Sequence, residues 1–486
     1  MAKLYIFGIG GTGSRVLKSL IMLMATGIKI KDNGGIPYEI VPIVIDPDHA
    51  AADFTRTVKL MQDYNKIYNR LDHNNSAANK FFGTKINMEI IPSVRIPLNN
   101  TLDVDFKEHI GLPLMKDTNG NPNANYALAS MLFSQKNLDA KMEVGFKGNP
   151  NIGSVVLNQF AMSKEFIDFA ASFGQNDRIF IISSIFGGTG ASGFPLLLKK
   201  LRALGSEVAG NNNVKNAIIG AITVLPYFDV KPIENSEIDS STFVSKTKAA
   251  LSYYDHNITE ANALYYIGDC DVTKQYENSA GGTTQRNESH FVELAAALAI
   301  TDFAIQSDFA TQNGIPINPV YKEFGIRETV DQIIFSTLDG KTNNKIKKSL
   351  TAFTLFCKYL NEQIWDSKGQ PWSIAHGFDD NFLNSAFFQT ELSDIKTAYL
   401  EWLTEMSNNR RAFAPFDLRE KKNDLFSMIK GEKPARVASF KSNYALFDDK
   451  LNGIQDKIKR DASKEHIFIE LFYSAIDKLV NSKFRL

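Results

Sequence analysis

Short, continuously apolar runs alternate with helical patterns along the first part of the chain. Residues 4–7 (LYIF) and 38–45 (YEIVPIVI) have the composition of buried strands, and residues 14–25 between them repeat apolar side chains at helical spacing. We expect further strands at residues 178–183, 217–225 and 263–267, and helices at residues 152–173 and 194–204. Buried strands separated by helices are typical of a mainly parallel sheet that is covered on both faces.

The pattern of apolar and charged residues changes twice along the chain, which suggests that the protein has three parts. The first is an α/β domain over residues 1–286, with an insertion at about 60–144 whose later part is rich in Asn, Gly and Pro. Residues 287–312 form a long and very apolar helical pattern, so we expect a central helix buried between two masses. Charged, helix-like stretches dominate after residue 343, and we expect residues 313–486 to form a C-terminal helical or α+β domain.

Composition and charge exclude several classes of protein. The 486 residues carry 54 basic and 54 acidic side chains, so the chain lacks the basic excess of a broad nucleic-acid-binding face. Its two cysteines, Cys270 and Cys357, have no metal-ligand spacing, which favours thiols in a reducing compartment. No apolar run reaches the roughly 18–20 residues of a membrane span, and the N-terminus leads directly into a strand pattern. We therefore expect a soluble, cytoplasmic protein.

The first candidate site is the loop GIGGTGS at residues 8–14, between a predicted strand and a predicted helix. Glycines let the backbone approach a phosphate, and the N-terminus of the helix adds partial positive charge. Gly8, Gly10 and Gly13 also fit the dinucleotide fingerprint G-x-G-x-x-G, with Asp46 where a ribose-binding acid would lie. Alone, this loop fits a dinucleotide, a nucleoside triphosphate or a tight turn without a ligand.

A second glycine-rich loop narrows the choice. Residues 184–193 (SIFGGTGASG) follow the strand at 178–183 and precede a helical pattern, so they form a second phosphate cradle. A simple dinucleotide fold needs one such loop, whereas a nucleoside di- or triphosphate can use two facing loops. The chain has no G-x-x-x-x-G-K-[ST] motif, which excludes a Walker-type NTPase.

Six segments of the chain resemble, in order, the nucleotide-binding segments of the tubulin/FtsZ superfamily. They are GIGGTGS (8–14), IDPDHAAA (45–52), GFKGNPNIGS (145–154), FGGTGASG (186–193), TVLPYF (223–228) and YIGDCD (266–271). The fourth resembles the family signature GGGTG[ST]G, with Phe186 in place of its first glycine. The resemblance covers about residues 1–312. It implies a tubulin/FtsZ-like GTP-binding domain, most similar to divergent bacterial tubulin-like proteins.

The resemblance assigns roles to individual residues. It implies phosphate contacts from Gly10, Gly11, Thr12, Gly13, Ser14, Gly148, Asn149, Gly187, Gly188, Thr189, Gly190, Ala191, Ser192 and Gly193. It implies ribose or base contacts from Pro226, Asp269, Asn287, His290 and Phe291, and places Mg²⁺ near Asp46 or Asp48 through water. A carboxylate such as Asp269 can accept from both N1–H and the exocyclic amine of guanine, independently of family. Glu293, inside an apolar run, needs a partner, a shifted pKa or an orientation toward the cleft.

The resemblance further implies head-to-tail self-association, with GTP hydrolysis completed by acids of the next subunit. The family motif N-x-D-x-x-D is absent, and the remaining candidate acids are Asp302, Asp308, Glu323, Glu328 and Asp331. One alternative is a nucleotide-binding scaffold that does not hydrolyse GTP. Another is a dinucleotide- or ATP-dependent α/β enzyme of the ThiF type, against which stands the absence of CxxC pairs. The expected partner is a second copy of the chain. The sequence does not decide whether an adaptor protein also binds.

Overall fold

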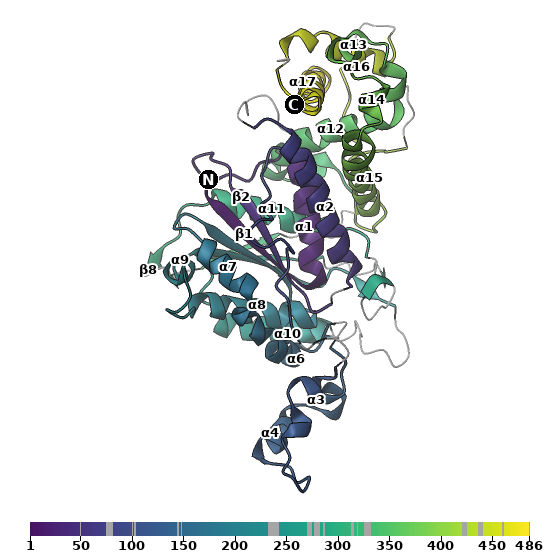
Figure 1. The fold of residues 1–486 in the computed structure, drawn as a ribbon. Coiled ribbons are helices and arrows are strands. Elements are labelled where there is room, and N and C mark those ends of the chain that lie inside the picture. The colour runs from purple at the N-terminus through teal and green to yellow at the C-terminus, as the bar shows by residue number, and fades with distance from the viewer. Residues whose placement is uncertain are drawn as a thin grey trace.

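A six-stranded parallel sheet forms the centre of the computed structural model (Figure 1). The strand order is β10-β6-β4-β3-β1-β2, formed by Val320–Phe324, Ala263–Ile267, Ile218–Val224, Arg178–Ser184, Lys3–Ile9 and Glu39–Ile45. The structure describes residues 1–48, 50–73, 81–99, 101, 104–142, 145–146, 148–231, 243–269, 275–276, 282–284, 287–312, 315–317, 319–324, 332–419, 425–435, 441–458 and 461–485. The five strands expected from the sequence are confirmed, and β10 adds a sixth from beyond the central helix.

Alternate side chains of each strand enter two separate cores, as the pleat of a strand requires. Leu4 and Ile6 of β1 pack with the helices α1 (Gly10–Ala25), α2 (Ala52–Arg70) and α11 (Phe291–Ile305). Tyr5 and Phe7 point to the other face. That face is covered by α6 (Pro150–Leu157), α7 (Lys164–Ser172) and α8 (Gly188–Arg202), with α9 (Asn211–Lys215) and α10 (Phe243–Asn257) beside them (Figure 1). The expectation of a parallel sheet with helices on both faces is confirmed.

Four predicted helices have different bounds in the structure, and the one expected at residues 14–25 begins earlier, at Gly10. The helix expected at residues 152–173 is interrupted, because the side chain of Ser163 caps a new helix by accepting from Phe166 N. The helix expected at 194–204 begins earlier, at Gly188. The central helix expected at 287–312 spans only Phe291–Ile305, since Arg178 Nη1 binds the carbonyl of Gln306 at 2.7 Å and ends it.

The predicted insertion at about 60–144 is wrong in its first part, because residues 60–70 belong to α2 and residues 86 and 95 bridge to β2; its later part projects from the body as an arm (Figure 1). We use "arm" for residues 104–142, which contain α3 (Phe106–His109), α4 (Ala124–Leu132) and α5 (Gln135–Leu138). Its base is held by edge-on packing of Phe106 against Phe133, with ring centroids 4.8 Å apart. The arm is therefore an ordered unit with its own small core.

The C-terminal region is mainly helical, as expected, and packs on the α1–α2 side of the sheet (Figure 1). Its helices are α12 (Gly340–Glu362), α13 (Pro371–His376), α14 (Asp380–Leu383), a π-helix (Phe387–Leu392), α15 (Ser393–Ser407), α16 (Asn443–Asn452) and α17 (Lys464–Phe484). Small strand pairs join β11 (Gln332–Ile333) to β12 (Ala412–Phe413), β5 (Asp229–Val230) to β7 (Gln275–Tyr276), and β8 (Thr311–Gln312) to β9 (Ile315–Pro316). Among the described residues, no helix is both long and apolar enough to span a bilayer.

Candidate functional site: paired glycine loops at the end of the sheet

The order of the strands reverses between β1 and β3, since β2 lies on one side of β1 and all later strands lie on the other. Open parallel sheets bind ligands beyond the carboxyl ends of their strands at such a point. The first glycine loop follows β1 and the second follows β3, and the two strands are neighbours. Both predicted phosphate loops therefore lie side by side at the position where the topology favours a ligand.

In the first loop the glycines permit a very close turn. A Cβ at Gly13 would lie 2.6 Å from Cα of Gly8, which no side chain tolerates. Gly10 has φ of +69°, a left-handed conformation that favours glycine, and it opens α1. The Ser14 hydroxyl is fully buried and has no hydrogen-bond partner among the described residues. A buried, unpaired hydroxyl at the N-terminus of a helix fits a phosphate oxygen.

The second loop is equally crowded. A Cβ at Gly190 would lie 2.7 Å from Ser184 N, and one at Gly193 would lie 2.8 Å from Ile9 Cγ2. Ser192 Oγ donates to the carbonyl of Gly188 at 2.7 Å, so this expected phosphate donor is engaged by the loop itself. Ala191 is buried, and its carbonyl accepts from Tyr254. Phe186, the departure from the family signature, packs on Phe228 and Phe243 beside the loop.

The two loops meet each other, and the second also meets Gly148 and Asn149. A Cβ at Gly10 would lie 3.4 Å from Cβ of Thr189, and one at Gly188 would lie 3.0 Å from Asn149 N and 3.2 Å from Gly148 N. Gly187 caps α8 in an extended conformation. The Asn149 amide donates to the carbonyl of Phe146 at 2.7 Å, so it serves a turn in this structure and not the expected ligand contact.

Lys246 of α10 is a cation at this site that sequence reasoning missed. Its Nζ lies beside Gly148, 2.9 Å from the position that a Cβ there would take. An ammonium group next to a backbone cradle suits a phosphate ligand, because it adds a point charge to the amide dipoles. No local motif marks Lys246, since it lies about a hundred residues from the segment that it approaches.

Asp46 and Asp48 follow directly after β2, which ends at Ile45, and they lie beside the first loop. Burial raises the pKa of Asp46 to about 7, although the Asp48 amide donates to Asp46 Oδ1 at 3.1 Å. Arg95 donates to the Asp46 carbonyl, and Asp48 Oδ2 accepts from Gly282 N at 2.6 Å. No group of three or more His, Cys, Asp or Glu side chains in the described parts of the chain forms a metal cluster. Asp46 therefore fits Mg²⁺ only where phosphate and water supply the other ligands.

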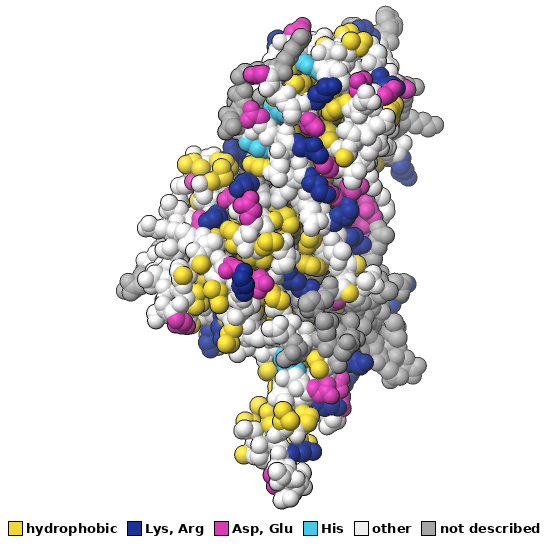
Figure 2. All heavy atoms as spheres, viewed as in Figure 1, with side chains coloured by type: hydrophobic (Ala, Val, Ile, Leu, Met, Phe, Trp, Pro, Cys, Tyr) yellow, Lys and Arg dark blue, Asp and Glu magenta, His cyan; other side chains and the backbone are white. Residues whose placement is uncertain are grey.

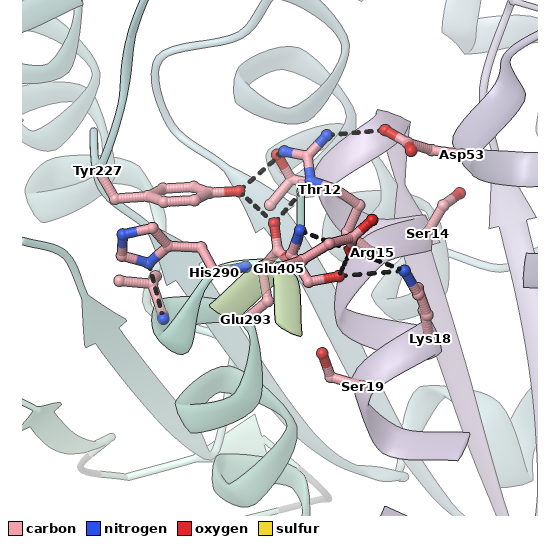
Figure 3. Close-up of polar contacts among 12 residues, drawn as sticks. Thr12, Ser14, Arg15, Lys18, Ser19, Asp53, Tyr227, His290, Glu293 and Glu405 are labelled. Carbon is pink, nitrogen blue, oxygen red and sulfur yellow. Dashed lines mark hydrogen bonds and ion pairs between the residues drawn. The ribbon is translucent and has the colours of Figure 1, made fainter. Parts of the chain in front are cut away.

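Arg15, directly after the first loop, forms the centre of a buried polar network (Figure 3). Its Nε donates to Glu293 Oε1 at 2.7 Å, Nη1 to Asp53 Oδ2 at 3.0 Å, and Nη2 to the Tyr227 hydroxyl at 2.8 Å. Nη2 also donates to Thr12 Oγ1 at 3.3 Å. Burial opposes its charge, yet Tyr227, Glu293 and Asp53 raise the pKa of Arg15 well above its usual value. The network joins α1, α2, α11 and the segment after β4.

Glu293 meets the expectation that a buried carboxylate needs a partner. Burial raises its pKa, and the pairing with Arg15 and Tyr227 opposes that rise. His290 caps α11, with Nδ1 accepting from Val292 N at 3.0 Å, and its ring meets Tyr227 edge-on at 5.0 Å (Figure 3). The sequence marked Glu293 but not Arg15, although an arginine after GGTGS was a visible signal.

The expected base-contacting residues have mixed placements. Asp269 Oδ2 accepts from Arg411 Nε at 2.6 Å, and both side chains are buried, so the carboxylate is held by the C-terminal region. Phe291 stacks on Phe413 in the core with centroids 5.3 Å apart. Asn287 is buried, and Pro226 precedes Tyr227 of the Arg15 network. Of the expected base-contacting residues, Pro226 is the sequence neighbour of Tyr227, and the ring of His290 contacts the ring of Tyr227.

Two of the candidate acids, Asp302 and Asp308, lie at the other end of α11. Its C-terminus meets Arg178 at the amino end of β3, whereas its N-terminus meets Arg15. Asp302 binds Lys322 at 2.5 Å and Lys341 at 3.1 Å, and these contacts outweigh burial and lower its pKa to about 2. Asp308 is exposed and accepts from Ser307. Glu323 is also exposed, and Glu328 and Asp331 lie outside the described residues.

Comparisons with known proteins give structural neighbours only. No family model and no curated protein sequence matches the chain. The structure is similar to CetZ from Methanosaeta thermophila strain DSM 6194, with 16% identity over 64% of this chain and 57% of that chain, at a TM-score of 0.32. It is similar to a GTPγS-bound protofilament of CetZ2 from Haloferax volcanii, with 12% identity over 63% of this chain and 60% of that chain, at a TM-score of 0.30. It is also similar to an empty FtsZ dimer from M. jannaschii, with 14% identity over 64% of this chain and 57% of that chain, at a TM-score of 0.26.

The match spans less than two thirds of each of these three chains. FtsZ gives its name to the superfamily that the glycine-loop sequences resemble. At such identities and TM-scores, the likeness assigns no residue and no activity to this chain. These matches are weak likenesses, and the resemblance of the chain to a family rests on its glycine-loop sequences.

Proposed function

We propose that this protein binds GTP or GDP, with Mg²⁺, between its two glycine loops, and that it associates head to tail with further copies. The observation that carries the proposal is the pair of loops beyond the adjacent strands β1 and β3, at the point where strand order reverses. Crowding at Gly13 and Gly190 leaves no room for a side chain. Two such loops suit a polyphosphate, because each presents backbone amides at the N-terminus of a helix.

In this proposal residues 10–14 bind the α- and β-phosphates, and residues 187–193 bind the β- and γ-phosphates. The buried Ser14 hydroxyl and the Lys246 ammonium group add a donor and a positive charge. Asp46 holds Mg²⁺ through water, and a bound cation would favour its ionised form. Asp269, which accepts from Arg411, also accepts from guanine, since a carboxylate has about four acceptor positions.

Hydrolysis, in this proposal, occurs where two subunits meet. Helix α11 runs from the nucleotide edge of the sheet to the opposite edge, where Asp302 and Asp308 lie. In a head-to-tail stack the opposite edge of one subunit meets the nucleotide edge of the next. An exposed carboxylate such as Asp308 then orients the attacking water for in-line displacement at the γ-phosphate, while backbone amides stabilise the developing charge.

A second candidate function is a nucleotide-dependent scaffold without turnover. Asp302 is held by two lysines, and such a carboxylate is poorly placed to orient water. Assembly and disassembly would then follow nucleotide exchange and not hydrolysis.

One set of measurements separates these functions. The purified chain is incubated with GTP, ATP or NAD, and binding, phosphate release and pelleting are measured against protein concentration. GTP-dependent phosphate release that rises faster than linearly with protein supports hydrolysis between subunits. Binding and pelleting with GTP but without phosphate release supports the scaffold. Preference for NAD or ATP would contradict both.

A further inference from the structure

A cavity of about 310 Å³ lies between the sheet, the central helix α11 and the start of α12. Tyr265 of β6 and Lys322 and Phe324 of β10 line it from the sheet. Ala295 and Ala299 line it from α11, and the first turns of α12 line the third side. Small-molecule sites have volumes of roughly 300–1,000 Å³, so this cavity can hold one small organic molecule.

The cavity exists because small side chains of α11 face the sheet at this point. Ala295 and Ala299 are spaced i and i+4, so they lie on one side of the helix, and each offers only a methyl group. Leu298, Tyr265 and Phe324 supply the larger apolar surfaces. Hydrophobic side chains also gather on the projecting arm (Figure 2), but there they lie on a protrusion, whereas a small molecule needs a concave site. The cavity is therefore suited to the apolar part of a ligand.

Three lysines line the described part of the same cavity, and one of them is unpaired. Lys322 and Lys341 both pair with Asp302, at 2.5 Å and 3.1 Å. Lys345 is partly buried, and it forms no hydrogen bond or ion pair with any of the described residues. Burial lowers the pKa of Lys345, although the negative charge of Asp302 opposes this effect. Because an ammonium group without a partner is costly to bury, an anion beside Lys345 would be stabilising.

The exposure of the lining residues orients the ligand within the cavity. Ala295 is 6% exposed, whereas the side chain of Lys341 is 78% exposed, so the cavity opens to solvent on the α12 side. Lys341 and Lys345 are spaced i and i+4 and lie on one side of α12. A ligand therefore places its apolar part against α11 and its charged group near the opening, beside Lys345.

We propose that this cavity binds a small monocarboxylate with an apolar body, such as a medium-chain fatty acid, and that Lys345 pairs with its carboxylate. A single unpaired lysine in the described part of the cavity suits a ligand with one negative charge. The inference does not rest on the proposed nucleotide site, because none of the described residues of the two glycine loops lines this cavity. The ligand contacts the sheet, α11 and α12 at once, so its binding stabilises the folded arrangement of the three.

Calorimetric titration with decanoate tests the site. For the unaltered chain we expect saturable binding of one decanoate per chain. Lys345→Met removes the charge and should raise the dissociation constant at least about tenfold, whereas Lys345→Arg keeps the charge and should stay within about threefold. Lys200→Met is the matched control and should bind as the unaltered chain does, since Lys200 of α8 is also partly buried and forms no hydrogen bond or ion pair with the described residues.

Decanol and decylammonium test the role of charge, because they keep the apolar body and change the head group. We expect both to bind at least about tenfold more weakly than decanoate. Absence of saturable decanoate binding to the unaltered chain would overturn the proposal. Equal decanoate affinity of the Lys345→Met variant, or equal affinity of the unaltered chain for decylammonium, would overturn it as well.

Ala299→Leu tests the position of the apolar body without a change of charge. The larger side chain extends into the space beside β6 and β10 and should weaken decanoate binding at least about tenfold. Thermal unfolding of the same preparation shows whether the variant is folded. A folded Ala299→Leu variant with the affinity of the unaltered chain would place decanoate elsewhere and would contradict the proposal. If this variant does not fold, the comparison of Lys345→Met with Lys200→Met decides the outcome.

Discussion

Replacement of Gly188 by alanine tests whether the close contact between the second glycine loop and residues 145–149 serves nucleotide binding. The added Cβ would lie 3.0 Å from Asn149 N and from Phe146 Cβ, and 3.2 Å from Gly148 N. The two backbone segments must then separate by a few tenths of an ångström. Overpacking of this kind costs about 1–3 kcal/mol. If that strain distorts the cradle, the dissociation constant for GTP rises by roughly ten- to a hundredfold.

The assay titrates a fluorescent GTP analogue and measures urea unfolding on the same preparations. Gly340→Ala is the control, since a Cβ at the first residue of α12 meets nothing within 4 Å. We expect the control to bind as the unaltered chain does and to be slightly more stable. A folded Gly188→Ala variant with GTP affinity within twofold of the unaltered chain would refute the assignment of this loop. Gly190→Ala would overlap the backbone of Ser184, and we expect a larger loss of stability there.

Three further predictions follow from buried groups. Because the folded pKa of Asp46 is raised to about 7, the folded protein binds a proton that the unfolded chain has lost, so stability without nucleotide should fall from about pH 4 to pH 7. Urea unfolding of Asp46→Asn across this range should show a weaker fall, and an unchanged slope would contradict the raised pKa. Arg15→Met leaves the Glu293 carboxylate buried without its arginine, while Asp53 keeps Arg56, and should cost about 3–5 kcal/mol in urea unfolding. Adding Glu293→Gln should recover part of that loss, whereas additive losses would argue against the pairing. Cys357 is buried with a raised pKa, so a thiol reagent should modify it only after unfolding, as peptide mapping can check.

The sequence predicted local elements well where a single pattern determined them. The apolar runs of β1, β2, β3, β4 and β6 are short, are rich in Ile and Val or aromatic residues, and are typical of strands buried on both faces. The bounds of α11 were not predictable, because Arg178 ends that helix from more than a hundred residues away. The interruption after α6 was a local signal that was missed, since Ser163 is a typical N-cap residue.

The candidate site was predictable to the extent that it is made of contiguous backbone. Gly10 and Gly190 could be assigned to it because glycine-rich turns between a strand and a helix commonly bind phosphate. Side chains brought from elsewhere could not be placed in this way. Lys246 and Arg411 come from distant parts of the chain, and their approach to Gly148 and Asp269 depends on how whole elements pack.

The central sheet has two lateral edges, and in the described parts of the chain neither presents a long, uncharged strand for pairing. Beside β2, residues 86 and 95 form parallel bridges with residues 40 and 44, so the chain itself occupies that edge. The other edge is the five-residue strand β10, where Lys322 is paired with Asp302 and Glu323 is exposed. Short, charged edge strands resist pairing with another sheet. Growth by lateral addition of strands is thereby discouraged, and this agrees with the proposed association of copies along the strand direction.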